Sequence, residues 1–234
     1  MTTNNAETDR DQEDWHGRWR DGRIGFHQPV VNRLLEKFWP TLVAEPHGSV
    51  FIPLCGKSHD MTWLAERGHD VIGVELSEIA ASAYFSERGL DPAERQSDGF
   101  KVLSGGGVEI WCGDYFAFPK SRISDCVGAY DRASLIALPP AVRKRYADTF
   151  TQLMPPATET LLLTISYDQS EADGPPYSVP DGEVHALFAG NFAVRHLGSR
   201  DATEASGNLT SKGVTSVSSS VFALHATPSA SIDA

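Results

Sequence analysis

The feature that most constrains the fold is the stretch over residues 49–75, SVFIPLCGKSHDMTWLAERGHDVIGVE. Its two short apolar runs, SVFIPL and VIGV, have the pattern of strands buried on both faces. Between them lie a tight turn at Gly56, a short helical segment that Ser58 can cap, and Gly68, a residue type that commonly ends helices. This strand–helix–strand order predicts a parallel α/β sheet with a nucleotide bound at the carboxyl ends of its strands.

Glu75 directly follows the second strand, about 20 residues after the first turn, a spacing at which a carboxylate can accept hydrogen bonds from ribose hydroxyls. A dinucleotide-binding turn needs the spacing G-x-G-x-x-G, whereas this turn has only Gly56. The sequence therefore favours a ligand that has an adenosine but no pyrophosphate, of which S-adenosylmethionine is the commonest. The alternative is that Glu75 merely places a favourable negative charge before the next helix.

The length of 234 residues suits one α/β domain with a full core. We expect a disordered polar tail over residues 1–13, a single domain over 14–226 and a frayed tail over 227–234. No run approaches the ~20 apolar residues of a membrane helix. Because the polar, acidic N-terminus is unlike a signal or transit peptide, we expect a cytoplasmic protein without a membrane partner.

Charge and cysteine usage exclude further classes. The net charge of -11, without a basic stripe, argues against nucleic acid as a partner. Cys55, Cys112 and Cys126 are widely spaced in apolar surroundings, which predicts reduced, buried thiols. The eight histidines form no H-E-x-x-H pattern, so no metal site is predicted. No exposed apolar feature demands a partner chain, and we expect a monomer.

Three aromatic residues near the N-terminus are candidates for a ligand site. Trp15 and Trp19 are four residues apart, on one face of a predicted short helix, and Phe26 follows in a glycine-containing loop. These rings could pack as a lid over the core, and taken alone this interpretation is favoured. They could instead surround a cationic ligand such as a sulfonium, because aromatic faces attract positive charge.

Two later loops carry further candidates. Asp114 could accept a hydrogen bond from an adenine amino group, and Tyr115 could stack on the ring, although an Asp here can equally cap a turn. Asp131 and Arg132 end another buried strand, which places them at the mouth of the expected crevice. The alternative is a local ion pair that contributes little.

Taken together, these segments resemble the thiopurine S-methyltransferase family, of the bacterial kind. The matching segments, in the family's order, are W-x-x-x-W from residue 15, IGFHQ from 24, PLCGKSHDMTWLAERGHDVIGVELSE from 53, WCGDYF from 111, YDRASLIALPPAVRKRYA from 130 and GPPYSVP from 174. The resemblance covers roughly residues 14–200, and PLCGK followed by GVE is highly specific.

The resemblance implies the class I S-adenosylmethionine-dependent methyltransferase fold, a Rossmann-like, mostly parallel sheet of seven strands with helices on both faces. It also implies that residues 14–48 cover S-adenosylmethionine. The cofactor-binding residues implied by the family are Trp15, Trp19, Phe26, Leu54, Glu75, Asp114, Tyr115 and Arg132. Phe26 and Arg132 would also bind the substrate, and Arg132 would be catalytic, orienting an anionic acceptor or relaying a proton through water.

One segment departs from the family. Residues 201–213 hold few of the basic and aromatic residues usual there. By the resemblance, Asn208 matches an arginine that approaches the substrate in related enzymes. We therefore expect the cofactor chemistry to be retained, while the preference for the methyl acceptor can differ.

The implied reaction is in-line methyl transfer to an aromatic or heterocyclic thiol, yielding S-adenosylhomocysteine. Positioning the nucleophile at ~3–3.5 Å can lower such a barrier by ~7–11 kcal/mol. Aromatic thiols ionise near neutral pH, so no strong general base is required. Two alternatives remain: a different small acceptor (halide, sulfide, or a selenium or tellurium oxyanion, as in detoxification), or a cofactor-binding protein without turnover.

Overall fold

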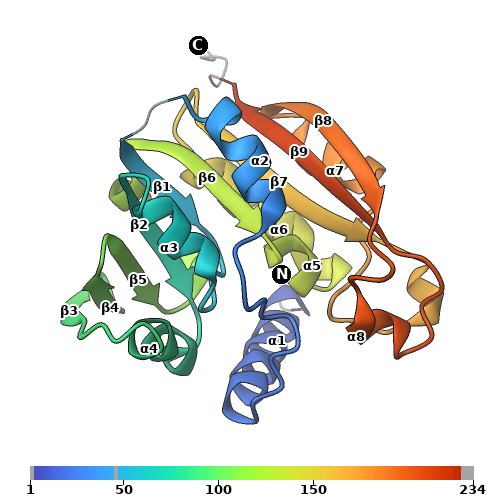
Figure 1. Ribbon diagram of the computed structural model, residues 1–234, viewed down its shortest axis with the longest axis horizontal. Coiled ribbons are helices and arrows are strands. Elements are labelled where there is room, and N and C mark those ends of the chain that lie inside the picture. The colour runs from blue at the N-terminus through green and yellow to red at the C-terminus, as the bar shows by residue number, and fades with distance from the viewer. Residues whose placement is uncertain (1–2, 45–46, 228–234) are drawn as a thin grey trace.

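The computed structural model describes residues 3–44 and 47–227, with side chains from residue 12 onward. Its described strands form one sheet of nine in the order β3-β4-β5-β2-β1-β6-β7-β9-β8 (Figure 1). The strands are β1 (Gly48–Ile52), β2 (His69–Glu75), β3 (Ala93–Ser97), β4 (Phe100–Gly105), β5 (Val108–Cys112), β6 (Cys126–Arg132), β7 (Glu159–Ser166), β8 (Phe192–Asp201) and β9 (Ser218–Ala226).

The centre of the sheet is parallel, as the apolar runs predict. β5, β2, β1, β6 and β7 pair in parallel, whereas β9 runs antiparallel to both β7 and β8. These seven strands are the predicted sheet. The hairpin of β3 and β4 extends it beyond β5, so the sheet has two strands more than predicted. β3 was not foreseen because its sequence, AERQS, is polar and exposed and gives no alternating pattern.

Helices cover both faces of the sheet. Helices α2 (Arg33–Leu42), α3 (His59–Ala65) and α4 (Glu78–Ser86) pack on one face, and α6 (Pro140–Leu153) and α7 (Asp181–Phe188) pack on the other. The short helices are α5 (Ser134–Ala137) and α8 (Gly207–Thr210). The fold thus has the helix–sheet–helix layers that the sequence predicts.

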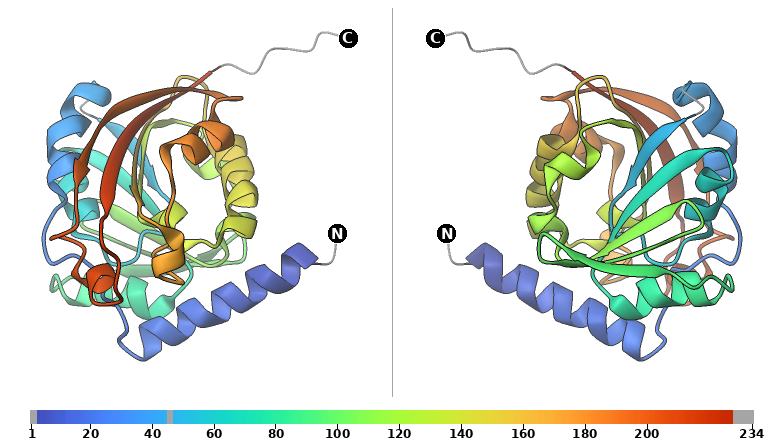
Figure 2. Two further views of the ribbon diagram at one scale, coloured as in Figure 1. Left: turned by 90° about the vertical axis from the view of Figure 1, so that its right-hand side faces the viewer. Right: turned by 90° about the vertical axis from the view of Figure 1, so that its left-hand side faces the viewer.

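The first helix, α1 (Thr3–Arg20), stands apart from these layers. It runs below the carboxyl ends of the parallel strands and contacts α4 and α6 (Figures 1 and 2). The prediction of a disordered segment over residues 1–13 is therefore wrong for residues 3–13. This part contains good helix formers, and a helix that is anchored at its end by packed tryptophans extends cooperatively. The predicted frayed tail lies outside the described residues from 228 onward.

The first strand–helix–strand unit matches its prediction in detail. The side chain of Ser58 accepts a hydrogen bond from the backbone N–H of Asp60 at 3.1 Å, which caps α3. Gly68 has a φ of 90°, the left-handed conformation expected after a helix. β1 and β2 then pair in parallel, so the turn at Gly56 and the end of β2 meet at the same edge of the sheet.

Candidate active site

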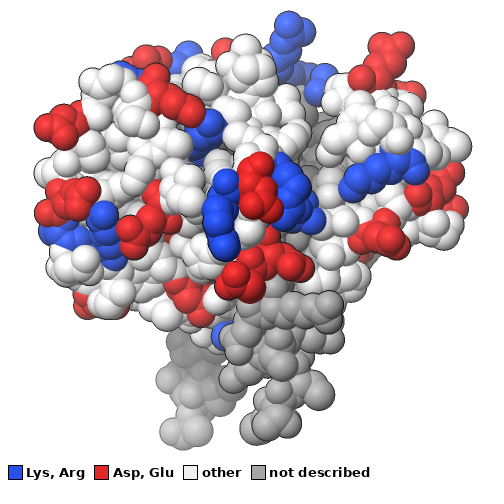
Figure 3. Space-filling view, turned by 90° about the horizontal axis from the view of Figure 1, so that it is seen from below, with Lys and Arg blue, Asp and Glu red and all other residues white. Residues whose placement is uncertain are grey.

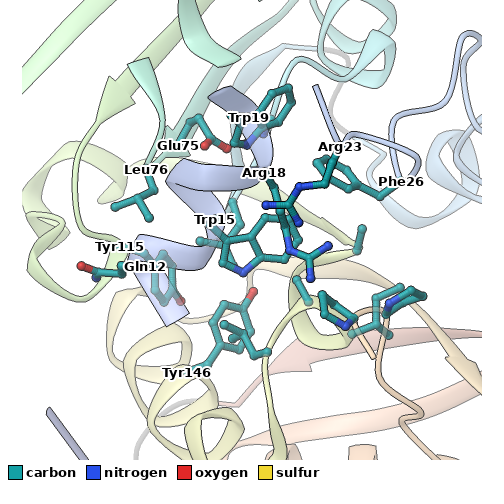
Figure 4. A pocket seen from close by; sticks show the side chains of 18 of the residues that line it. Gln12, Trp15, Arg18, Trp19, Arg23, Phe26, Glu75, Leu76, Tyr115 and Tyr146 are labelled. Atoms are coloured by element: carbon teal, nitrogen blue, oxygen red, sulfur yellow. The ribbon is translucent and has the colours of Figure 1, made fainter. Parts of the chain in front are cut away.

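A cavity of about 260 Å³ lies at this edge of the sheet, bordered on its open side by α1 and the segment that follows it (Figure 4). Seven of the eight predicted cofactor-binding residues line it: Trp15, Trp19, Phe26, Leu54, Glu75, Asp114 and Tyr115. Arg132 does not. Residues predicted from separate segments of the sequence thus converge on one cavity.

The turn after β1 is held in an unusual conformation. Leu54 has a φ of 45° and Gly56 a φ of 55°, both in the left-handed region. The hydroxyl of Ser134 donates to the carbonyl oxygen of Pro53 at 2.9 Å, which ties the turn to α5. A non-glycine residue with positive φ is costly, and such residues cluster at ligand sites. The turn therefore presents Leu54 and the backbone of Gly56 to the cavity in a fixed arrangement.

Glu75 is buried at the end of β2, and both of its carboxylate oxygens accept backbone hydrogen bonds. The N–H of Gly56 donates to Oε2 at 2.8 Å and the N–H of Ser77 donates to Oε1 at 2.8 Å. Burial raises the pKa of Glu75 to about 7, and the backbone donors oppose that shift. Glu75 thus fixes the turn to the strand end as well as facing the cavity, a contact that neither sequence interpretation foresaw.

The three aromatic residues of the N-terminal segment form one cluster over the cavity. The ring of Phe26 makes edge contacts with Trp15 at 5.3 Å and with Trp19 at 5.4 Å between ring centroids. Trp19 lies over the turn, where its ring is 3.5 Å from the position a Cβ on Gly56 would take. The three rings therefore pack against one another, as the lid interpretation predicts. They cover the cavity and also line it.

Asp114 and Tyr115 lie on the far side of Glu75, after β5. Asp114 Oδ1 accepts from the N–H of Phe116 at 3.0 Å, so this residue does cap a turn, and it also lines the cavity. Tyr115 is buried and its ring stacks on Tyr146 at 5.0 Å between ring centroids. The two alternatives weighed for Asp114 are therefore compatible.

The buried carboxylate of Asp131 holds Tyr146, the residue on which Tyr115 stacks. The hydroxyl of Tyr146 donates to Asp131 Oδ2 at 2.6 Å, and both residues are almost fully buried. Burial raises the pKa of Asp131 to about 6, while the hydrogen bond from Tyr146 lowers it. The alternative of a local ion pair between Asp131 and Arg132 is wrong, because neighbours on a strand point to opposite faces of the sheet.

Arg132 instead faces Asp60, with 3.9 Å between Nη1 and Oδ2. Asp60 is buried, and it also accepts from the N–H of Asn32 at 2.8 Å and from the hydroxyl of Tyr130 at 3.0 Å. Arg132 therefore sits beside the cavity, next to the lining residue Ala133, and in this conformation it does not border the space itself.

Several lining residues escaped the sequence reasoning. Arg18, Arg23 and Lys212 border the cavity, as do Tyr146 and the Pro175–Pro176 pair. Tyr146 and the two prolines gave a signal only as parts of segments shared with the family. The charged residues looked like ordinary surface residues, because the folding of α1 and α8 toward the same space cannot be read from local patterns. Asn208 also lines the cavity, so the divergent segment does border the site.

The three cysteines are free and buried, as predicted. Burial raises the pKa of Cys112 and of Cys126 to about 12, and it raises that of Cys55 as well. These thiols are protonated at neutral pH, which makes them poor nucleophiles. Cys55, although next to the cavity turn, has no covalent role to play there.

Other kinds of site find no support in the described part of the chain. Its His, Cys, Asp and Glu residues form no group of three or more that could hold a metal ion. Over the same residues, no helix is both long and apolar enough to cross a membrane. On the face in Figure 3, Lys and Arg side chains are interspersed with Asp and Glu rather than gathered by sign.

The sheet order, the acid at the end of β2 and the cavity beside it define a class I S-adenosylmethionine-dependent methyltransferase fold. Solved structures agree with this class. A methyltransferase acting on 1,6-didemethyltoxoflavin from Burkholderia thailandensis, with S-adenosylhomocysteine bound, aligns with a TM-score of 0.63 at 17% identity, covering 97% of this chain and 92% of that one. A magnesium protoporphyrin IX methyltransferase from Synechocystis aligns with a TM-score of 0.64 at 11% identity, covering 93% of this chain and 100% of that one.

The sequence comparisons are more specific. The family model described as thiopurine S-methyltransferase matches residues 10–227. A thiopurine S-methyltransferase of Pseudomonas syringae pv. tomato is 45% identical over 210 residues, covering 90% of this chain and 96% of that protein. One from Bordetella petrii is 45% identical over 214 residues, covering 92% and 98%. The chain belongs to the thiopurine S-methyltransferase family.

Proposed function

We propose that this chain transfers the methyl group of S-adenosylmethionine to the sulfur of a thiopurine or a related aromatic thiol. The observation that carries the proposal is the convergence of Glu75, the turn at Leu54 and the cluster of Trp15, Trp19 and Phe26 on one cavity. Family membership supports the same activity. The substrate is a small molecule, and we infer a cytoplasmic, monomeric enzyme.

The residues present fit S-adenosylmethionine. Glu75 offers carboxylate oxygens for the ribose hydroxyls, and the apolar side chains of Leu76 and Phe116 offer contacts for the adenine beside Asp114 and Tyr115. The aromatic cluster suits a sulfonium, because ring faces attract a cation. When bound, S-adenosylmethionine supplies the methyl group and becomes S-adenosylhomocysteine.

The chain's own contribution is to position the reactants and to exclude water. The described cavity provides no Ser-His-Asp or Cys-His arrangement, which agrees with a direct displacement that needs no protein nucleophile. A thiolate that meets a sulfonium neutralises charge, so the dry wall formed by Trp19 and Phe26 favours the reaction. Holding the sulfur in line accounts for much of the expected acceleration.

Release of S-adenosylhomocysteine with a panel of acceptors tests the proposal. The panel contains 6-mercaptopurine, thiophenol, sulfide, iodide, selenite and tellurite. The proposal expects turnover on the aromatic thiols well above that on every inorganic acceptor. Preference for an inorganic acceptor would replace the proposed substrate class, and binding of S-adenosylhomocysteine without any turnover would make the chain a cofactor-binding protein.

A further inference from the structure

Asp60 places a buried carboxylate in the first turn of α3, where the helix itself does not require it. The residue is 1% exposed, and a carboxylate in such surroundings destabilises a fold unless neighbouring groups compensate for its burial. The helix is already capped, because the side chain of Ser58 accepts from the N–H of Asp60. Both carboxylate oxygens of Asp60 make their contacts outside α3, which indicates a role beyond starting this helix.

Three elements meet at this carboxylate. The N–H of Asn32, the residue that caps α2, donates to Oδ1 at 2.8 Å. The hydroxyl of Tyr130 donates to Oδ2 at 3.0 Å, and Nη1 of Arg132 lies 3.9 Å from the same oxygen. Tyr130 and Arg132 are two residues apart on β6, so their side chains leave the same face of the sheet. Asp60 therefore joins the start of α2, the start of α3 and the end of β6.

Arg132 supplies the charge that balances Asp60. Burial raises the pKa of Tyr130 and the negative charge of Asp60 raises it further, so this hydroxyl stays protonated and donates as a neutral group. The N–H of Asn32 is neutral as well. Among the side chains that the structure describes, Arg132 is the one cation within ion-pair distance of Asp60. The pair therefore links a fully buried acid to a guanidinium at the end of the strand.

The attraction orients Arg132 without occupying its donors. A separation of 3.9 Å is too long for a hydrogen bond, but the attraction between charges is strong where water is largely excluded. The other end of the guanidinium approaches the segment that borders the cavity. Burial lowers the pKa of His27, which follows the lining residue Phe26, and the positive charge of Arg132 is among the causes that lower it further.

We infer that Asp60 is a positioning residue, which holds the guanidinium of Arg132 in the orientation that methyl transfer requires. Reactive groups need such support from residues behind them, because a misdirected side chain loses most of its effect. Asp60 does not line the cavity, so it acts through Arg132. The inference rests on the proposed function and on the role that the family implies for Arg132. A purely structural Asp60 would affect stability without a specific effect on turnover.

Kinetics of Asp60→Asn test the inference. The amide can still accept from the N–H of Asn32 and can donate to the hydroxyl of Tyr130, so this variant removes the charge and keeps the shape. We expect kcat on thiophenol to fall about tenfold, equivalent to ~1.4 kcal/mol, while the affinity for S-adenosylhomocysteine stays within about twofold of the parent. An unchanged kcat would overturn the inference.

The matched control is Tyr130→Phe, which removes a hydrogen bond to Asp60 and leaves the charge pair in place. This variant should lower the midpoint of urea unfolding but keep kcat within about twofold of the parent. Equal losses of kcat in Tyr130→Phe and Asp60→Asn would make Asp60 a structural residue and would overturn the inference.

A double variant separates action through Arg132 from an independent effect. If Asp60 acts through Arg132, adding Asp60→Asn to Arg132→Lys should lower kcat by no more than about twofold beyond Arg132→Lys alone. A further loss of about tenfold would show that Asp60 acts by another route, which would also overturn the inference.

Nuclear magnetic resonance of the arginine side chains provides a readout that needs neither turnover nor a stable variant. In the parent protein, the guanidinium of Arg132 should rotate about its Nε–Cζ bond more slowly than that of the exposed Arg20. Asp60→Asn should remove this difference, and equal rates for the two arginines in the parent would overturn the inference. Absence of turnover on thiophenol by the parent would instead contradict the proposed function, and the rotation rates would still decide whether Asp60 holds Arg132.

Discussion

The Arg132 guanidinium lies 3.9 Å from the carboxylate of the buried Asp60, and no hydrogen bond within the described residues holds it there. This distance is at the limit of an ion pair, and the Arg132 side chain retains 19% exposure. Its fork of donors is therefore available to a ligand, even though Arg132 does not line the cavity in this conformation.

We expect Arg132→Lys to lower kcat/KM on an aromatic thiol by about tenfold or more, equivalent to ~1.4 kcal/mol, because an ammonium cannot reproduce the planar fork. Affinity for S-adenosylhomocysteine should stay within about twofold of the parent. Steady-state kinetics and calorimetry on both proteins measure the two quantities. Equal turnover would remove Arg132 from the reaction, and a matched loss of cofactor affinity would make it a cofactor ligand.

Glu75 predicts a dependence of cofactor binding on pH. Burial raises the pKa of Glu75 to about 7, and ribose hydroxyls that donate to its oxygens favour the ionised form. Binding must therefore lower the pKa, so affinity for S-adenosylhomocysteine should weaken as the pH falls from 8 to 6. Titrations across this range measure it.

The variant Glu75→Gln should lower the affinity by ~1.5–3 kcal/mol, the range for a hydrogen bond to a charged group, and should flatten the pH dependence. The matched control is Glu78→Gln, since Glu78 is exposed nearby and lies outside the cavity. If Glu75→Gln kept the parent's pH profile, another group would be responsible for it.

The contribution of Glu75 to folding stability should depend on pH in the opposite sense to its contribution to cofactor affinity. Because the pKa of Glu75 is higher in the folded chain than its ordinary value of 4.5, the folded state binds more protons between about pH 4.5 and 7. The stability that protonated Glu75 contributes is therefore lost as the pH rises through this window. Urea unfolding at pH 5 and pH 8 measures this loss. Between pH 5 and pH 8 the free energy of unfolding should fall more for the parent than for Glu75→Gln.

The buried pair of Tyr146 and Asp131 predicts a stability effect. Tyr146→Phe removes the donor to the Asp131 carboxylate and should cost ~1–3 kcal/mol in the free energy of unfolding. Loss of the donor raises the pKa of Asp131 further above its value of about 6, so the cost should be larger at pH 8 than at pH 4. Adding Asp131→Asn should remove most of this pH dependence, and a cost that is equal at both pH values would contradict the account.

The N-terminal segment should become less mobile when ligand binds. Phe26 contacts Trp15 and Trp19, and all three rings border the cavity. A Cβ added at Gly22 or Gly25 would meet no atom within 4 Å, so the chain is loosely packed at both glycines. Amide hydrogen exchange over residues 14–28 should therefore slow when S-adenosylhomocysteine is added, measured by mass spectrometry. Exchange that is already slow and stays unchanged would make these residues ordinary core residues.

The predictions from sequence succeeded where local pattern and family resemblance agreed. The apolar runs on either side of α3 form strands, Ser58 caps that helix and Glu75 ends the second strand, all as predicted. Each of these features depends on neighbours in the chain. The polar strand β3 and the length of α1 could not be predicted, since pairing and tertiary anchoring stabilise them.

The same limit applies to the site. The family resemblance implied the role of Leu54, and Asp114 was a candidate in the loop after a predicted strand. A parallel sheet brings both positions to one edge. Arg18 and Lys212 are separated by most of the chain, and only the folded arrangement of α1 and α8 brings them to one cavity. Asp131 and Arg132 show the reverse case, because their adjacency allowed a local ion pair as an alternative, and the alternation of side chains along the strand separates them.

The most direct test of the account follows the methyl group itself. The purified protein is incubated with S-adenosylmethionine labelled as S–CD3 and with 6-mercaptopurine, and the products are identified by mass spectrometry. The account predicts S-methylated 6-mercaptopurine that carries the intact CD3 group, together with an equal amount of S-adenosylhomocysteine. Binding of S-adenosylmethionine without a labelled thioether, or tight binding of NAD in its place, would contradict it.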